Sequence, residues 1–156
     1  MTASASDTTQ MPAGLKAHIA RAVELFENLS PARLPDIGQL YADDAFFKDP
    51  FNEVNGSEKI RSIFAHMYVA LNDPRFEVKS RFGEGNEAFL EWHFIFRFKD
   101  TRPTEWQCVR GSTHLRFDSA GRIVYHRDYW DAAEELYEKI PLLGGLMRWI
   151  KKKAGG

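Results

Sequence analysis

The stretch AFLEWHFIFRFK, residues 88–99, decides the fold class because a large apolar side chain occupies every second position. Successive side chains of a β-strand point to opposite faces of the sheet, so this pattern predicts a long strand with one apolar face. We expect that face to line the interior, and it carries Leu90, Trp92, Phe94, Phe96 and Phe98. The opposite face mixes apolar and charged residues, which suits contact with water or with a second copy of the chain.

Three neighbouring segments are also rich in β-forming residues: 76–82, 106–117 and 122–130. Short connections that contain Gly, Asp or Asn separate them, so we expect the four strands to form an antiparallel meander. A shorter strand is predicted at 45–50, where Pro50 must end the strand or place it at a sheet edge because it has no amide hydrogen. The pair Asp43 and Asp44 is expected to break the helix that precedes this strand.

Apolar residues recur at helical spacing over residues 15–29 and 57–71, with a short helix predicted between them that ends near Tyr41. Ser57 has the side chain of a helix N-cap. The helical period returns after Trp130, as far as residue 140. Helices kept apart from an antiparallel sheet are typical of an α+β domain.

The composition excludes several classes of function. A net charge of -1 provides no field to attract nucleic acid. The single cysteine, Cys108, rules out an internal disulfide and a thiolate cluster, which favours a reducing compartment and a cytoplasmic protein. The five histidines are scattered and no Gly-rich phosphate loop occurs, so we expect neither a metal nor a cofactor.

The two ends of the chain differ from the 13–140 domain. Residues 1–12 are rich in Ser, Thr and Ala, lack the features of a secretory signal and are expected to be a disordered tail. Residues 141–156 are apolar and then basic, the pattern of an amphipathic tail. We expect this tail to dock on protein, with an anionic membrane surface as the alternative.

The last predicted strand places a carboxylate on an inward face. Val124, His126, Asp128 and Trp130 share one side of it. A buried carboxylate is costly unless hydrogen bonds support it, and an apolar environment favours its neutral form. Asp128 is therefore a candidate for proton transfer, and His126 is a candidate proton relay. The alternative for Asp128 is a structural carboxylate that pairs with His126, Tyr68 or an arginine.

Two motifs, YADDAFFKDP at 41–50 and GRIVYHRDYWD at 121–131, carry a family resemblance together with Gly56. The chain resembles the SnoaL-like branch of the nuclear transport factor 2-like superfamily over residues 15–140. The resemblance implies a cone-shaped fold in which a strongly bent sheet and the helices on its concave face surround a deep pocket, often in a homodimer. Members include ketosteroid isomerases, polyketide cyclases, limonene epoxide hydrolases and non-catalytic modules, so the site must decide the function.

The resemblance also implies roles for two aspartates. Asp49 falls where ketosteroid isomerases keep their general base, although Thr113 replaces the acid of their oxyanion hole. Asp128 matches a catalytic aspartate of limonene epoxide hydrolases, whose other catalytic positions here hold Trp92, Phe94, Phe47 and Asp49. The alternative for Asp49 is a residue that caps the turn before Pro50.

We therefore expect a pocket for a small apolar molecule, with Asp49, Asp128 and His126 as catalytic candidates. The predicted ligand-binding residues are Phe47, Tyr68, Leu90, Trp92, Phe94, Phe96, Thr113 and Trp130. Three functions stay open. They are proton-transfer isomerisation or cyclisation of a carbonyl compound, ligand binding or dimerisation without catalysis, and epoxide hydrolysis. A homodimer is expected to form through the outer sheet face.

Overall fold

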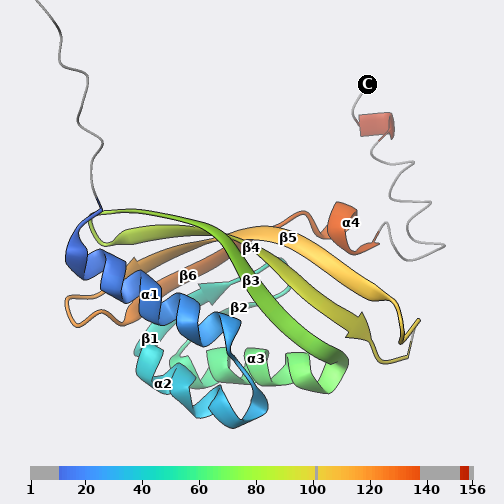
Figure 1. Ribbon diagram of the computed structural model, residues 1–156, viewed down its shortest axis with the longest axis horizontal. Coiled ribbons are helices and arrows are strands. Elements are labelled where there is room, and N and C mark those ends of the chain that lie inside the picture. Colours follow the sequence, from blue (N-terminus) through green and yellow to red (C-terminus); the bar gives the residue numbers. More distant parts are fainter. Residues whose placement is uncertain (1–10, 101, 138–151, 155–156) are drawn as a thin grey trace, which may run out of the picture.

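A computed structural model describes residues 11–100, 102–137 and 152–154. Its six strands form one sheet in the order β2-β1-β6-β5-β4-β3, which curls strongly along its length (Figure 1). The strands are β1 (Tyr41–Lys48), β2 (Glu53–Asn55), β3 (Leu71–Glu84), β4 (Glu87–Phe98), β5 (Trp106–Phe117) and β6 (Ile123–Tyr129). The predicted meander of β3 to β6 is antiparallel throughout, and β1 joins β6 in parallel. The α+β prediction is confirmed.

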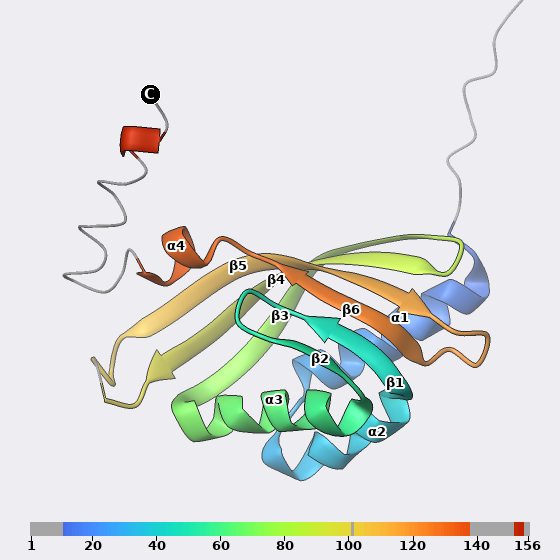
Figure 2. The same ribbon diagram turned by 180° about the vertical axis from the view of Figure 1, so that it is seen from behind.

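Most of the helical structure lies on the concave side of the sheet. Figure 2 shows α1, α2 and α3 beneath the arch of the strands. The helices are α1 (Ala13–Glu27), the 3-10 helix η1 (Pro31–Asp36), α2 (Ile37–Leu40), α3 (Ser57–Ala70) and the single-turn α4 (Ala132–Glu135). Helices α1, α2 and α3 thus cover the concave face, whereas α4 lies above β5 in both views.

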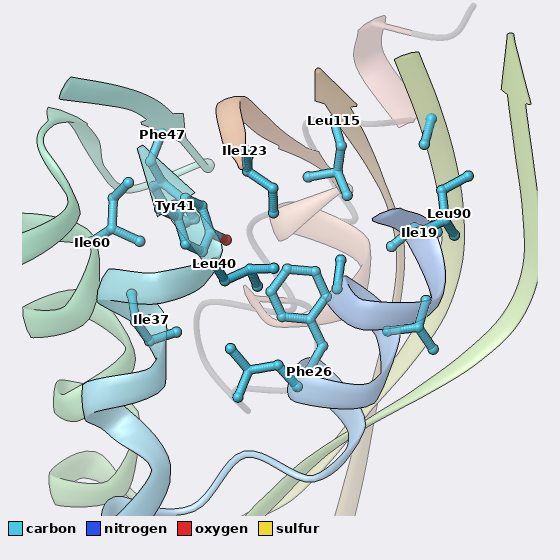
Figure 3. Packing of buried hydrophobic residues seen from close by; sticks show 14 of the residues in the cluster. Ile19, Phe26, Ile37, Leu40, Tyr41, Phe47, Ile60, Leu90, Leu115 and Ile123 are labelled. Atoms are coloured by element: carbon cyan, nitrogen blue, oxygen red, sulfur yellow. The ribbon is translucent and has the colours of Figure 1, made fainter. Parts of the chain in front are cut away.

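The core fills the space between these helices and the inner sheet face. Its largest fully buried side chains are Tyr41, Phe117, Ile19, Ile37, Ile60, Leu90, Leu115 and Ile123. In Figure 3, Ile19 and Phe26 of α1 face the sheet, and Tyr41 lies beside Phe47 and Leu40. Each buried side chain of this size contributes about 1.5–3 kcal/mol, so the core holds α1 rigidly against the strands.

Strand β1 differs from the prediction at its start. It begins at Tyr41 rather than at residue 45, and the register with β6 shifts between Tyr41 and Phe46. An irregularity of this kind lets one strand absorb extra residues. Asp43 and Asp44 therefore lie exposed within the strand. They are not the residues that end the preceding helix. The short helix predicted to end near Tyr41 is α2, which ends at Leu40.

Two smaller features also differ from what the sequence predicts. Ser57 is the first residue of α3 and makes no capping hydrogen bond, because Gly56 takes the N-cap position with φ of 110°. The short strand β2 was not predicted at all. It pairs antiparallel with the end of β1, with Val54 opposite Phe47.

The predicted final helix is described only in part. Asp131 caps α4 by accepting hydrogen bonds from the backbone amides of Ala133 and Glu134, at 3.0 and 3.1 Å. Residues 138–140, nearly all of the predicted C-terminal tail and residues 1–10 of the N-terminal tail lie outside the described residues. Among those described, no helix is long and apolar enough to span a bilayer.

Candidate functional site

A cavity of about 470 Å³ lies between α3 and the inner face of the sheet. This volume is within the range of small-molecule sites, about 300–1,000 Å³. Strand β4 supplies one wall through four alternate residues, and α3 supplies the opposite wall through residues at helical spacing. The wall residues from these two elements are Trp92, Phe94, Phe96 and Phe98, and Ser62, Ile63, Phe64, His66, Met67 and Ala70.

The rest of the wall is also largely apolar. Phe76 and Leu71 come from β3, Val109 from β5, and Trp130 and Leu136 from the segment around α4. Besides Ser62 and His66, the polar wall residues are Asp49, Asn52 and Asp128. Within the described ranges, no group of three or more His, Cys, Asp or Glu side chains is arranged to hold a metal ion.

Asp128 borders both this cavity and a smaller hollow behind it. The smaller hollow has a volume of about 20 Å³ and shares Phe64, Phe76 and Trp92 with the large one. The Asp128 side chain is only 16% exposed. A carboxylate with so little access to water needs hydrogen-bond partners.

Two side chains meet this need at a single oxygen of Asp128. Thr113 Oγ1 lies 2.5 Å and His126 Nε2 lies 2.8 Å from Oδ1. Thr113 in turn accepts a hydrogen bond of 2.7 Å from the indole Nε1 of Trp92. Among the described residues, no hydrogen-bond partner is found for Oδ2, so this oxygen is available to a ligand.

The side chain of His126 is enclosed by aromatic rings and by Tyr41. The Tyr41 hydroxyl oxygen lies 2.7 Å from His126 Nδ1, and both residues are buried. Burial, followed by the charge of Asp128, raises the pKa of Tyr41 well above its ordinary value. The Phe47 ring packs on the imidazole at 4.6 Å, and the Phe26 ring meets it edge-on at 5.9 Å. Tyr41 thus joins the site although the sequence did not single it out.

Asp49 lies at the edge of the same cavity, yet a turn uses its carboxylate. Its Oδ1 accepts hydrogen bonds from the backbone amides of Phe51 and Asn52, at 2.8 and 2.6 Å. The Asn52 side-chain amide lies 3.1 and 3.0 Å from the two carboxylate oxygens. These contacts are those of the turn-capping alternative.

The structure brings together most of the other predicted site residues. Phe47, Trp92, Phe94, Phe96 and Trp130 line the large cavity, and Leu90, Thr113 and His126 line the small hollow.

Tyr68 lies differently from the rest of the predicted set, because neither hollow includes it among its described wall residues. Tyr68 follows Met67 on α3, and the side chains of successive helix residues point about 100° apart. The Tyr68 side chain therefore points in a different direction from that of Met67, which lines the cavity. Of the partners expected for a structural Asp128, namely His126, Tyr68 or an arginine, the structure pairs it with His126, and its other hydrogen bond comes from Thr113.

Comparison with known proteins agrees with this architecture. The family model described as SnoaL-like domain matches residues 19–126, which is more than half of the chain. The chain belongs to the SnoaL-like domain family. The match stops two residues before Asp128, so the candidate carboxylate lies just beyond it. No curated protein matches this SnoaL-like chain.

Solved structures share the fold at low sequence identity. A putative SnoaL-like polyketide cyclase from Jannaschia is 12% identical, with a TM-score of 0.67 over 83% of this chain and 93% of that one. An epoxide hydrolase of the limonene type from M. tuberculosis is 14% identical, with a TM-score of 0.63 over 88% and 95%.

A third structure contains a bound small molecule. It is a hypothetical protein from Catenulispora acidiphila with a ketosteroid isomerase-like fold, in complex with trimethylamine. It is 16% identical, with a TM-score of 0.66 over 76% of this chain and 88% of that chain. At these identities the three structures support the fold alone.

Proposed function

We propose that this SnoaL-like protein binds a small, largely apolar molecule in the cavity and transfers a proton with Asp128. One observation carries the proposal. Thr113 and His126 hold Oδ1 of Asp128, Oδ2 has no partner among the described residues, and Asp128 lines a largely apolar cavity. A carboxylate oriented in this way, with one oxygen left for substrate, is a suitable general base.

The proposal assigns the base to Asp128 rather than Asp49. Asp49 accepts hydrogen bonds from two backbone amides and from the Asn52 side chain. Protonation of Asp49 would weaken these bonds, because a neutral carboxylic acid is a poorer acceptor than a carboxylate, and with them the cap of the turn after β1. Asp128 can take a proton on Oδ2, which carries no hydrogen bond among the described residues, while both bonds to Oδ1 stay in place.

The reaction that fits a single carboxylate is isomerisation or cyclisation of a carbonyl compound. Asp128 Oδ2 takes a proton from the carbon next to the carbonyl, and the electron pair of the broken C–H bond forms the enolate. In isomerisation, the resulting carboxylic acid then gives its proton to another carbon of the same molecule. In cyclisation, the enolate carbon instead forms a bond to a second carbonyl carbon of the molecule, and the acid gives its proton to the oxygen of that carbonyl. The step needs no added oxidant or reductant, and the apolar walls would hold the hydrocarbon part.

The first test uses 5-nitrobenzisoxazole, a small apolar compound whose ring opens when a base removes its carbon-bound proton. We expect the wild-type protein to release the coloured phenolate with saturation kinetics. Asp128→Asn should lower the rate by about 100-fold or more, the usual contribution of a positioned general base. Asp49→Asn is the matched control and should keep most of the rate.

Circular dichroism and thermal unfolding must show that both variants are folded. A rate unchanged by Asp128→Asn would refute the proposed role of Asp128. Binding of the compound to the wild-type protein without ring opening would instead favour the non-catalytic ligand-binding module.

A further inference from the structure

We propose that Tyr41 and His126 are positioning residues that fix the reactive geometry of Asp128. In this arrangement the Tyr41 hydroxyl holds His126 in the neutral form protonated at Nε2, and the imidazole donates that proton to Oδ1 of Asp128. The consequence for catalysis depends on the proposed role of Asp128. The arrangement of protons itself does not.

The partners of the two ring nitrogens define the protonation of His126. A neutral imidazole has one donor nitrogen and one acceptor nitrogen. Nε2 lies 2.8 Å from Oδ1 of Asp128, and an ionised carboxylate can only accept, so Nε2 carries the hydrogen. Nδ1 is then the acceptor, and the Tyr41 hydroxyl at 2.7 Å must donate to it.

A doubly protonated His126 fits these contacts poorly. Its Nδ1 would donate to the Tyr41 oxygen, and the Tyr41 hydroxyl proton would need a different acceptor. Tyr41 is 0% exposed, and His126 Nδ1 is the single partner of its hydroxyl among the described residues. A buried hydroxyl proton without an acceptor is unfavourable.

Among the described residues, the only charged side chain in contact with His126 is that of Asp128. Tyr41 from β1 and Asp128 from β6 are its titratable neighbours. Phe47 and Phe26 supply the aromatic contacts.

A second chain of donors reaches the same oxygen from the other side. The indole of Trp92 can only donate, so Thr113 Oγ1 accepts from it and directs its own hydroxyl proton to Oδ1 of Asp128. Both chains therefore end on Oδ1 and occupy its acceptor positions. They fix the carboxylate rotation and leave Oδ2 to receive the substrate proton.

The first experiment observes His126 directly. Long-range ¹H–¹⁵N correlation spectra of the ¹⁵N-labelled protein at about pH 7 report which imidazole nitrogen carries hydrogen. We expect His126 to show protonated Nε2 and bare Nδ1 in the wild-type protein. A spectrum with hydrogen on Nδ1, alone or together with Nε2, would refute the inference, whatever the catalytic activity.

The second experiment removes the Tyr41 hydroxyl. In Tyr41→Phe, Nδ1 loses its donor, and we expect the tautomer signals of His126 to change. The kcat for 5-nitrobenzisoxazole should fall by about 10-fold, the effect of one lost hydrogen bond. KM should stay constant, because Tyr41 borders neither hollow. Tyr125→Phe, on the outer face of β6, is the matched control and should change neither quantity.

A double-mutant cycle separates positioning from general destabilisation. In a His126→Leu background the Tyr41 hydroxyl no longer has a ring to orient, so Tyr41→Phe should have no further effect on kcat. Equal effects of Tyr41→Phe in both backgrounds would contradict the inference. The Nε2 tautomer together with full activity of Asp128→Asn would support the inference and refute the proposed function.

Discussion

At the scale of single residues, the site depends on small side chains as well as on Asp128. Gly111 of β5 lies opposite Trp92 of β4, and the large indole covers it. This packing places the indole NH against Thr113, which in turn contacts Asp128. A glycine without special backbone geometry thus helps to define the hydrogen bonds of the carboxylate.

Gly111→Ala should therefore disturb the site. A Cβ at this position would lie 2.5 Å from the Trp92 ring, which is buried and cannot move freely. We expect a loss of about 1–3 kcal/mol in the free energy of unfolding, as for other overpacked cores, measured by urea denaturation. The rate with 5-nitrobenzisoxazole should fall as well.

The matched control is Gly38→Ala in α2, where an added Cβ meets nothing within 4 Å. It should leave stability unchanged or raise it slightly, since Ala favours helix over Gly. Equal stability of the Gly111 and Gly38 variants would show that the Trp92 contact is not tight.

At the scale of elements, the single turn α4 matters because it supports one wall of the cavity. Trp130 and Leu136, on either side of α4, both line the cavity. The turn is attached to β5 through Glu135, whose side chain is 8% exposed. Its Oε1 accepts hydrogen bonds from Nε and Nη2 of Arg110, at 2.9 and 2.6 Å. This ion pair raises the pKa of Arg110.

Glu135→Gln should loosen α4 without unfolding the domain. The amide keeps the shape of the carboxylate but loses its charge, so the charge-assisted bonds to Arg110 weaken. We expect hydrogen exchange in residues 131–137 to become about 10-fold faster, and KM for the probe to rise. Glu134→Gln is the control, because Glu134 is exposed and lies 3.5 Å from Arg110. Unchanged exchange in Glu135→Gln would mean that other contacts hold the turn.

At the scale of the whole molecule, the convex sheet face carries exposed aromatic side chains. Phe82 and Phe89 are paired in register and are 67% and 47% exposed, and Trp106 is 51% exposed. Charges of both signs lie among them, including Glu87 paired with Arg116. An apolar surface with interspersed opposite charges can pair with a second copy of itself through a two-fold axis.

We therefore expect a homodimer through the convex face. Light scattering should give a mass of about 36 kDa, twice the 17.9 kDa of one chain. Phe89→Glu should shift the mass toward the monomer, because it places a charge in the interface. Val69→Glu changes a side chain on α3 that is even more exposed, at 68%, and should leave the dimer intact. A wild-type mass of one chain at micromolar concentration would contradict this expectation.

The sequence by itself determined the features that depend on local periodicity. Alternation along residues 88–99 and the helical spacing in 57–71 fixed which side chains face inward, because the geometry of a strand or a helix repeats every few residues. The positions of Trp92, Phe94 and Phe96 in the cavity wall follow from these patterns. The inward direction of Asp128 follows in the same way.

The tertiary structure alone decided how the two aspartates differ. Asp49 caps a turn because the chain folds back to form β2, a strand too short to leave a periodic signal. The orientation of Asp128 depends on the contact between His126 and Tyr41. These two residues are 85 positions apart in the sequence. They meet because β1 joins β6 in parallel with a shifted register, and such pairing depends on packing between distant segments rather than on local sequence.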